Sequence, residues 1–485
     1  MSSPLKKLAS QTALYGLSSI VGRLLNYLLT PLYTYSFTTS QYGVVIELYT
    51  YVSFLVVILT YGMETAFFNF SNKHNNDKKV YNTAFTSLLI STLLFVAFAT
   101  LFSNKIASFL DYNTHPEYIV WFIFIVAIDA VTAIPFALLR SQNKAKRFAF
   151  IRLLNIAVNI ALNIFYIAVC PKIFGNQSNL IYNPEIGIGY IFISNLIASI
   201  FTIVLLIPEL KQVKLFITKS LFKKMIIYAL PLLVGGLAGM INETLDRVLL
   251  KFLLPHDGMT MANIGIYGAC YKISIIMTIF IQTFRYAAEP FFFSQAQDKN
   301  ATSLYATVMH YFVIICSFIF LVTMSYIDVV KYFVGDNFRS GLHIVPVLLI
   351  ANLCLGIFFN LSIWYKLSGQ TKYGAFLTII GAIITITFNT LLIPVFGYTG
   401  AAWATLICYF TIMCVSYFMG QKKYFIPYKV IGTGKYLLLA LGMFALQYFV
   451  LNNCTFIFKM AVNTLLVLAF MALVFVLERK KIALA

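Results

Sequence analysis

Long apolar runs alternate with short polar connections along the whole chain. The runs are rich in Leu, Ile, Val and Phe, and a helix needs about 20 such residues to cross the hydrocarbon core of a bilayer. Fourteen runs fit this description, with the thirteenth the shortest: residues 11–33, 42–68, 80–102, 118–139, 148–170, 186–207, 226–252, 262–290, 303–326, 343–365, 374–393, 399–419, 436–451 and 457–477. Because lipid tolerates only helices and closed barrels, the pattern predicts an all-α membrane protein with about fourteen transmembrane helices.

Composition and motifs narrow the class of protein. Hydrophobic residues make up 60% of the 485 positions and charged residues 11%, whereas soluble domains carry about 25% charged residues. The seven cysteines are odd in number, form no CxxC motif and lie mostly inside apolar runs, so we interpret them as core residues. The sequence has no P-loop, HExxH or GxSxG motif, and no connection is long enough to fold as a domain. We therefore expect no enzyme activity, no metal and no cofactor.

The basic residues set the predicted orientation. A net charge of +19 can indicate nucleic-acid binding, but the Lys and Arg residues lie in the connections, so we expect no nucleic-acid partner. With a cytoplasmic N-terminus, the termini and the even-numbered connections carry 25 basic residues and the odd-numbered connections carry six. This asymmetry follows the positive-inside rule and predicts that both termini are cytoplasmic. The first run lacks a clear cleavage site, so it is interpreted as a retained helix.

The two halves of the chain show a weak internal repeat. A shift of 225 residues aligns the segment YGMETAFF with YAAEPFFF, and so Glu64 with Glu289; a shift of 226 aligns Asn163 with Asn389. Helices 1–6 then correspond to helices 7–12, and an even number per half predicts parallel repeats about an axis along the membrane normal. We therefore predict two six-helix lobes that rock around a central cavity. Their expected bounds are residues 1–224 and 225–420, with two additional helices in residues 421–485.

Several basic residues within the apolar runs are candidates for substrate binding. An ionisable group at membrane depth costs about 2.5–3.5 kcal/mol, so it tends to face a cavity or a partner. Arg23 lies in the first run, and its guanidinium suits bidentate binding of a phosphate. The alternative is an ion pair with Asp129 in the fourth run. Lys272 and Arg285 are thirteen residues apart in the eighth run, about 20 Å along a helix, and could form a basic track.

The acidic residues in the runs suggest pairing, gating or coupling. Glu47 is the repeat equivalent of Lys272, and the two could pair across the lobe interface as a gate. Glu64 and Glu289 lie near the cytoplasmic ends of their runs, so pairing with basic residues of the connections is the default; coupling to H⁺ or Na⁺ is the alternative. An intrahelical pair is also predicted for Glu243 and Arg247, which are spaced i, i+4.

The N-terminal region resembles a known family of transporters. The features are the Gly22-Arg23 pair in helix 1, the Tyr42-Gly43 pair that opens helix 2, and the two six-helix lobes followed by two helices. These are similar to the Wzx-type O-antigen and capsule flippases of the multidrug/oligosaccharidyl-lipid/polysaccharide exporter superfamily. The resemblance implies a multi-pass protein of the bacterial cytoplasmic membrane.

The resemblance also implies a substrate and a set of binding residues. The substrate would be an undecaprenyl-diphosphate-linked oligosaccharide, moved from the cytoplasmic to the outer leaflet by alternating access. A basic residue in helix 1 near the diphosphate corresponds to Arg23, with Asn26 one turn further on, and a helix 8 arginine of related flippases corresponds to Arg285 or Lys272. One departure is that six acids outnumber four bases within the apolar runs.

Two further expectations concern energy and an alternative function. A diphosphate carries about two negative charges, and moving one charge across 100 mV is worth about 2.3 kcal/mol. With a negative interior, outward movement of the anion is downhill, with or without H⁺ or Na⁺. The alternative function is a cation-coupled multidrug exporter of the same fold, in which Asp129 would be the key acid and Arg23 would repel the substrate.

Overall fold

The computed structural model describes residues 20–22, 24–73, 78–255, 258–296, 298, 300–451 and 454–482. Regular structure within these ranges is helical throughout, which confirms the predicted all-α class. Twelve helices in the described ranges are long and apolar enough to cross a membrane. They correspond to predicted runs 2–5 and 7–14. Run 6 appears as the shorter apolar helix Gly189–Leu205. Residues 11–19 and 23 of run 1 lie outside the described residues, so the count of fourteen stays a prediction.

The helices form two compact units. The first contains Met1–Phe252 and His256–Gly265, and the second contains Leu253–Pro255 and Ile266–Ala485. The seventh predicted span thus belongs to the same unit as the first six. The repeat suggests a boundary between lobes near residue 224, and that boundary stays a prediction.

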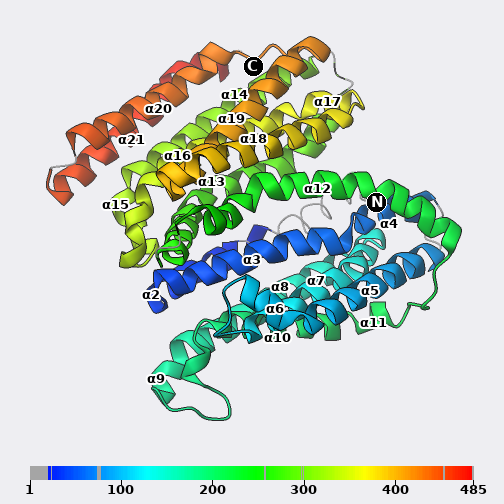
Figure 1. Ribbon diagram of the computed structural model, residues 1–485. Helices are drawn as coiled ribbons and strands as arrows, with labels where there is room; N and C mark the ends of the chain where they lie inside the picture. The colour runs from blue at the N-terminus through cyan, green and yellow to red at the C-terminus, as the bar shows by residue number, and fades with distance from the viewer. Residues whose placement is uncertain are drawn as a thin grey trace. The chain divides into compact units, whose positions relative to one another are not determined.

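The first unit contains the helices up to α12. Within it α7 contacts α3, α5 and α10, and α10 also contacts α8, so these helices run alongside one another in Figure 1. A small core of Phe136, Leu139, Phe148 and Ile151 joins α7 to α8. The helices are α2 (Leu29–Ser36), α3 (Thr39–Thr60), α4 (Met63–Lys73), α5 (Lys78–Leu101), α6 (Ser103–Phe109), α7 (Glu117–Ser141), α8 (Ala145–Asn163), the π-helix Ile164–Val169, α9 (Cys170–Phe174), α10 (Gly189–Leu205), α11 (Ile207–Leu210) and α12 (Lys219–Leu253).

The second unit is built mainly around α19. This helix contacts α16 and α18, while α14 contacts α16, α20 and α21. Trp364 and Tyr409 are buried in the core that joins α16, α17, α18 and α19. The helices are α13 (Thr260–Ser294, whose first turn belongs to the first unit), α14 (Ala301–Ser325), α15 (Ile327–Val330), α16 (Val345–Leu361), α17 (Ile363–Leu367), α18 (Lys372–Phe396), α19 (Tyr398–Lys423), α20 (Val430–Val450) and α21 (Phe456–Ile482).

Local sequence explains how the second predicted span begins and bends. Thr38 and Gln41 form a capping box, in which each side chain accepts a hydrogen bond from the other residue's backbone N–H. The span then breaks at Tyr61 and Gly62, which have φ values of 34° and 73°. Glycine adopts this left-handed conformation without steric cost. The break therefore divides one membrane span, Thr39–Ser71, into α3 and α4.

A close crossing joins the start of α3 to the first turn of α13 within the first unit. A Cβ atom on Gly43 would lie 2.0 Å from the backbone oxygen of Met261, and one on Gly265 would lie 2.0 Å from the backbone oxygen of Thr39. Both distances are far below van der Waals contact. The crossing therefore requires glycine on both helices, as is common where membrane helices approach closely.

Candidate functional site

An ion pair joins the ends of α4 and α7 in the first unit. The Arg140 guanidinium donates a hydrogen bond from Nη2 to the Glu64 carboxylate. The guanidinium carbon of Arg140 also lies 5.0 Å from the ring centre of Phe68 and 5.6 Å from that of Phe148. Glu64 thus has the basic partner that the sequence predicts as its default.

The second unit has a similar ion pair at the repeat-equivalent positions, with lysine in place of arginine. Lys366 Nζ lies 2.5 Å from Glu289 Oε1, and Arg285 Nε lies 3.0 Å from the same oxygen. Glu289 is 225 residues after Glu64, and Lys366 is 226 residues after Arg140. The predicted pairing of both acids with basic residues is therefore confirmed, and the structure adds that their partners are also repeat mates. A role of either acid in coupling or gating stays a prediction.

We expect the Glu289–Lys366 ion pair to stabilise the protein through its opposite charges. Glu289→Lys should place the new lysine beside Arg285 and Lys366. We expect the free energy of unfolding to fall by about 1 kcal/mol only, because partly exposed ion pairs contribute little to stability. The exchange Glu289→Lys/Lys366→Glu should restore most of the loss in a double-mutant cycle of melting temperatures. An exchanged protein as unstable as Glu289→Lys alone would contradict a pair that acts through its charges.

A polar stripe crosses α7, α8 and α10 of the first unit. The solvent-accessible Asp129 carboxylate interacts with the buried Ser199 hydroxyl and with the positive charge of Arg152. The Arg152 guanidinium carbon lies 4.1 Å from the ring centre of Phe136. The count of basic residues along the sequence included Arg152 with the cytoplasmic connections, although it lies near the start of run 148–170. In the structure α8 begins at Ala145 and carries Arg152 on a helix. For a basic residue near the end of an apolar run, the sequence does not show whether it lies on the helix or in the connection.

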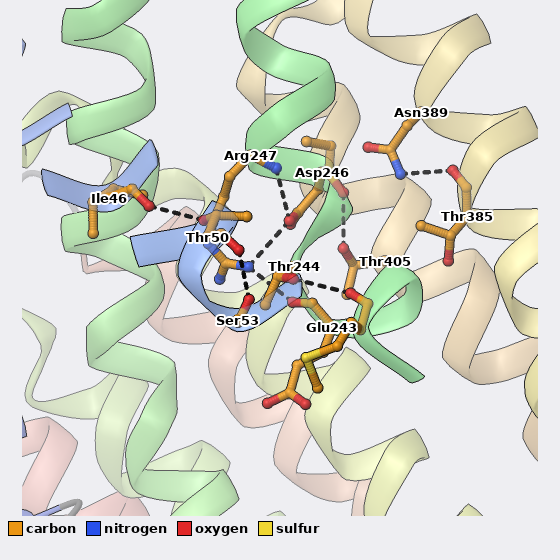
Figure 2. Close-up of polar contacts among 12 residues, drawn as sticks. Ile46, Thr50, Ser53, Glu243, Thr244, Asp246, Arg247, Thr385, Asn389 and Thr405 are labelled. Atoms are coloured by element: carbon orange, nitrogen blue, oxygen red, sulfur yellow. Dashed lines mark hydrogen bonds and ion pairs between the residues drawn. The ribbon is translucent and has the colours of Figure 1, made fainter. Parts of the chain in front are cut away.

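Asparagines extend this polarity along α8 and recur in α18. Asn163 Nδ2 donates to the backbone oxygen of Asn159, four residues earlier, at 2.8 Å, and Tyr33 donates to Asn163 Oδ1 at 2.9 Å. Its repeat mate Asn389 donates to the backbone oxygen of Thr385, again four residues earlier, at 2.7 Å (Figure 2). Both asparagine side chains are fully buried, so each unit holds a buried amide at positions that the 226-residue shift aligns.

Arg247 and Asp246 form the polar centre of α12. Arg247 Nη1 donates to Asp246 Oδ1 at 3.1 Å and to the backbone oxygen of Glu243 at 2.8 Å (Figure 2). Asp246 and Arg247 are buried, whereas Glu243 is exposed. The contact between positions 243 and 247 therefore runs through a backbone carbonyl, and the carboxylate that pairs with Arg247 belongs to the adjacent residue.

The most completely buried charge pair joins α3 to the end of α12. Lys251 Nζ lies 2.9 Å from Glu47 Oε1 and donates to the backbone oxygen of Leu110 at 2.5 Å. Tyr112 and Tyr51 donate to the Glu47 carboxylate at 2.5 and 2.8 Å. Glu47 is 0% exposed and Lys251 4%. Burial and the neighbouring Glu47 carboxylate hold the pKa of Tyr112 well above its usual range, so its hydroxyl remains a donor.

This cluster changes the expected surroundings of Glu47. The count of basic residues along the sequence included Lys251 with the odd-numbered, extracytoplasmic connections, although it lies at the end of run 226–252. The structure places Lys251 inside α12 and gives Glu47 a partner within its own unit. A pair between Glu47 and Lys272 stays a prediction. A gating role of Glu47 stays a prediction.

The other residues predicted to bind substrate are Arg23, Asn26, Lys272 and Arg285. Arg23 lies outside the described residues. Asn26 is exposed, and Lys272 is partly buried on α13. Arg285 is exposed and its guanidinium carbon lies 4.7 Å from the ring centre of Phe359. Their predicted contact with substrate stays a prediction.

A buried polar cluster that sequence reasoning missed ties the last two helices to α14. Glu478 of α21 is 2% exposed and accepts a hydrogen bond from Tyr436 of α20. His310 Nε2 lies 3.2 Å from Glu478 Oε1, and His310 Nδ1 lies 2.7 Å from the Thr433 hydroxyl oxygen. The available signals were a histidine inside an apolar run and a carboxylate next to the basic residues that end the last run.

Comparisons with known proteins bear on both family and fold. Residues 8–295 match the family described as polysaccharide biosynthesis protein. A solved structure of the lipid II flippase MurJ in an inward closed conformation has a TM-score of 0.74 at 15% identity, covering 97% of this chain and 99% of that chain. A solved structure of an inward-facing multidrug resistance MATE family transporter of the MOP superfamily has a TM-score of 0.65 at 14% identity. The match covers 83% of this chain and 94% of that chain. No curated protein matches the sequence. The fold is thus that of MurJ and the MATE transporters.

Proposed function

Because the chain belongs to the polysaccharide biosynthesis protein family, we propose that it flips an undecaprenyl-diphosphate-linked oligosaccharide from the cytoplasmic to the outer leaflet. The observation that carries this proposal is the combination of that family match with a fold shared with a lipid II flippase along 97% of the chain. The protein is a multi-pass membrane transporter of the MOP superfamily. We place it in the bacterial cytoplasmic membrane with both termini in the cytoplasm.

The proposed mechanism is alternating access between two lobes. Arg23 and Asn26 of helix 1, with Lys272 or Arg285 of α13, would hold the diphosphate, since guanidinium and ammonium groups bind phosphate oxygens by charge-assisted hydrogen bonds. The isoprenoid chain would stay in lipid while the sugars cross in the polar interior. The membrane potential, negative inside, would favour outward movement of the anion. H⁺ or Na⁺ coupling through Asp129, Glu47, Glu64 or Glu289 is a compatible addition.

The second candidate function is a cation-coupled multidrug exporter. The observations in its favour are the likeness to MATE transporters and the solvent-accessible carboxylate of Asp129. However, Asp129 lies close to Arg152, whose positive charge offsets that of the carboxylate. This neighbour makes Asp129 a weak attractor for an organic cation, so the observations favour the anionic lipid-linked substrate.

Gene deletion with complementation tests the proposed function. We expect the deletion to abolish surface polysaccharide and to leave lipid-linked oligosaccharide inaccessible to a glycosidase added to spheroplasts. Arg23→Ala should give the same phenotype at normal protein levels, while Arg23→Lys should retain part of the activity because it keeps the charge but loses bidentate binding. Normal surface polysaccharide in the deletion strain, with increased drug sensitivity, would favour the exporter. Normal polysaccharide in Arg23→Ala alone would remove Arg23 from the site.

A further inference from the structure

A polar pocket of about 710 Å³ lies within the first unit, apart from the polar stripe on α7, α8 and α10. Its walls come from the start of α3, the connection between α6 and α7 with the first turn of α7, the turn before α10, the end of α12 and the segment that leads into α13. All of these lie in or directly beside odd-numbered connections of the predicted topology. The positive-inside rule places these connections outside the cytoplasm, so the pocket opens on the extracytoplasmic side.

The lining of this pocket suits hydroxyl groups and disfavours a diphosphate. Asp111 and Glu185 contribute carboxylates, and Ser40, Thr114 and Thr260 contribute hydroxyls. The one Lys or Arg among the described lining residues is Lys251, whose ammonium lies 2.9 Å from Glu47. The pocket therefore has little positive charge to offer an anion. It presents many acceptors, which sugar hydroxyls can satisfy as donors.

The pocket is held in shape before any ligand binds. The Gln41 side-chain oxygen accepts a hydrogen bond from the Thr38 backbone N–H at 3.0 Å, which orients its NH₂ group as a donor. His115 stacks on Tyr118 with ring centres 4.8 Å apart and an interplanar angle of 5°. The Tyr118 hydroxyl in turn reaches the backbone oxygen of Ile186 at 3.4 Å and so connects α7 to the turn before α10. Aromatic faces beside fixed polar groups are typical of specific small-molecule sites.

An apolar cavity of about 640 Å³ lies on the other side of the Glu47 cluster. Tyr112 and Lys251 of that cluster line the polar pocket, whereas Tyr51 lines the apolar cavity. The apolar cavity is bounded by α3, α5, α6, α7 and α12, and Lys105 is the charged residue among its described lining. A polar pocket and an apolar cavity separated by one buried ion pair match the two ends of an amphiphile.

We propose that the polar pocket is an extracytoplasmic saccharide-binding site that holds the sugars of the glycolipid after it has been flipped. The proposal rests on the proposed function, because the transporter itself delivers the ligand to this side. Asp111, Glu185 and Gln41 bind sugar hydroxyls, and the stacked His115 and Tyr118 rings form one wall. The neighbouring apolar cavity accepts part of the isoprenoid chain.

Cysteine labelling in spheroplasts tests this site. Thr114→Cys is exposed at the pocket and should react with a membrane-impermeant maleimide added from outside. In cells that make the lipid-linked oligosaccharide, labelling should be about threefold slower than in cells lacking the first glycosyltransferase, as mass action requires for a site about two-thirds occupied. Leu180→Cys, fully exposed in another extracytoplasmic connection, should label equally fast in both strains.

A second variant separates direct protection from an indirect change of shape. Adding Glu185→Ala to Thr114→Cys should abolish the protection while leaving the labelling of sugar-free cells unchanged. Equal labelling of Thr114→Cys in both strains, in cells that still export polysaccharide, would overturn the saccharide site and leave the proposed function intact. Failure of the parent protein to export polysaccharide would instead count against the proposed function.

Discussion

Replacing Lys251 with methionine is expected to destabilise the protein by about 3–5 kcal/mol, because it leaves the buried carboxylate of Glu47 without its counter-charge. Glu47 is 0% exposed and is hydrogen-bonded by Tyr51 and Tyr112, which orient the carboxylate but cannot neutralise it. The measurement is the melting temperature of the purified protein in detergent. A loss on the order of 10 °C is expected from the usual relation between free energy and melting temperature.

Two further variants show whether a loss of stability comes from the broken ion pair. Glu47→Gln/Lys251→Met removes both charges and should recover most of the lost stability, since a buried pair can be replaced by neutral groups of similar volume at little cost. Lys105→Met removes an exposed lysine of α6 and should change the melting temperature little. A Lys251→Met protein as stable as the wild type would show that Glu47 is not held in a buried ion pair.

Replacing Gly43 with valine is expected to cost about 3 kcal/mol, at the upper end of the range for overpacking. The new Cβ atom would lie 2.0 Å from the backbone oxygen of Met261, and backbone cannot move aside as a flexible side chain can. The start of α3 must therefore separate from the first turn of α13. We expect a lower melting temperature and reduced polysaccharide export.

The matched control for this prediction is Gly239→Ala in α12. No described atom lies within 4 Å of a Cβ built at Gly239, so this change should be neutral or should stabilise the helix by up to about 1 kcal/mol. If Gly43→Val and Gly239→Ala had the same small effect, the close crossing of α3 and α13 would be contradicted.

The sequence predicts the membrane helices well because lipid imposes a strong constraint. Each span must contain enough apolar residues to cross the hydrocarbon core, and twelve of the predicted runs are found as long helices. The repeat also predicted that Glu64 and Glu289 would have basic partners. That prediction succeeds because repeat mates share their local surroundings, even where overall identity is low.

Contacts between distant segments could not be predicted in the same way. Lys251 is buried because the backbone oxygen of Leu110, 141 residues earlier, and the carboxylate of Glu47 meet it in the fold. Arg152 and Asp129 come together through the packing of α7, α8 and α10. Counting charges along the sequence assigns such residues to connections, because a basic residue at the end of a helix and one in a loop look alike.

Flipping by the purified protein in proteoliposomes tests the central claim most directly. Vesicles would contain undecaprenyl-diphosphate-linked oligosaccharide extracted from the deletion strain, and an added glycosidase would cleave the sugars exposed on the outer leaflet. Our account predicts cleavage of the whole lipid-linked pool in vesicles with the protein, and of the outer-leaflet fraction alone in protein-free vesicles. Equal cleavage in both kinds of vesicle, with the protein shown to be folded and inserted in the bilayer, would contradict it.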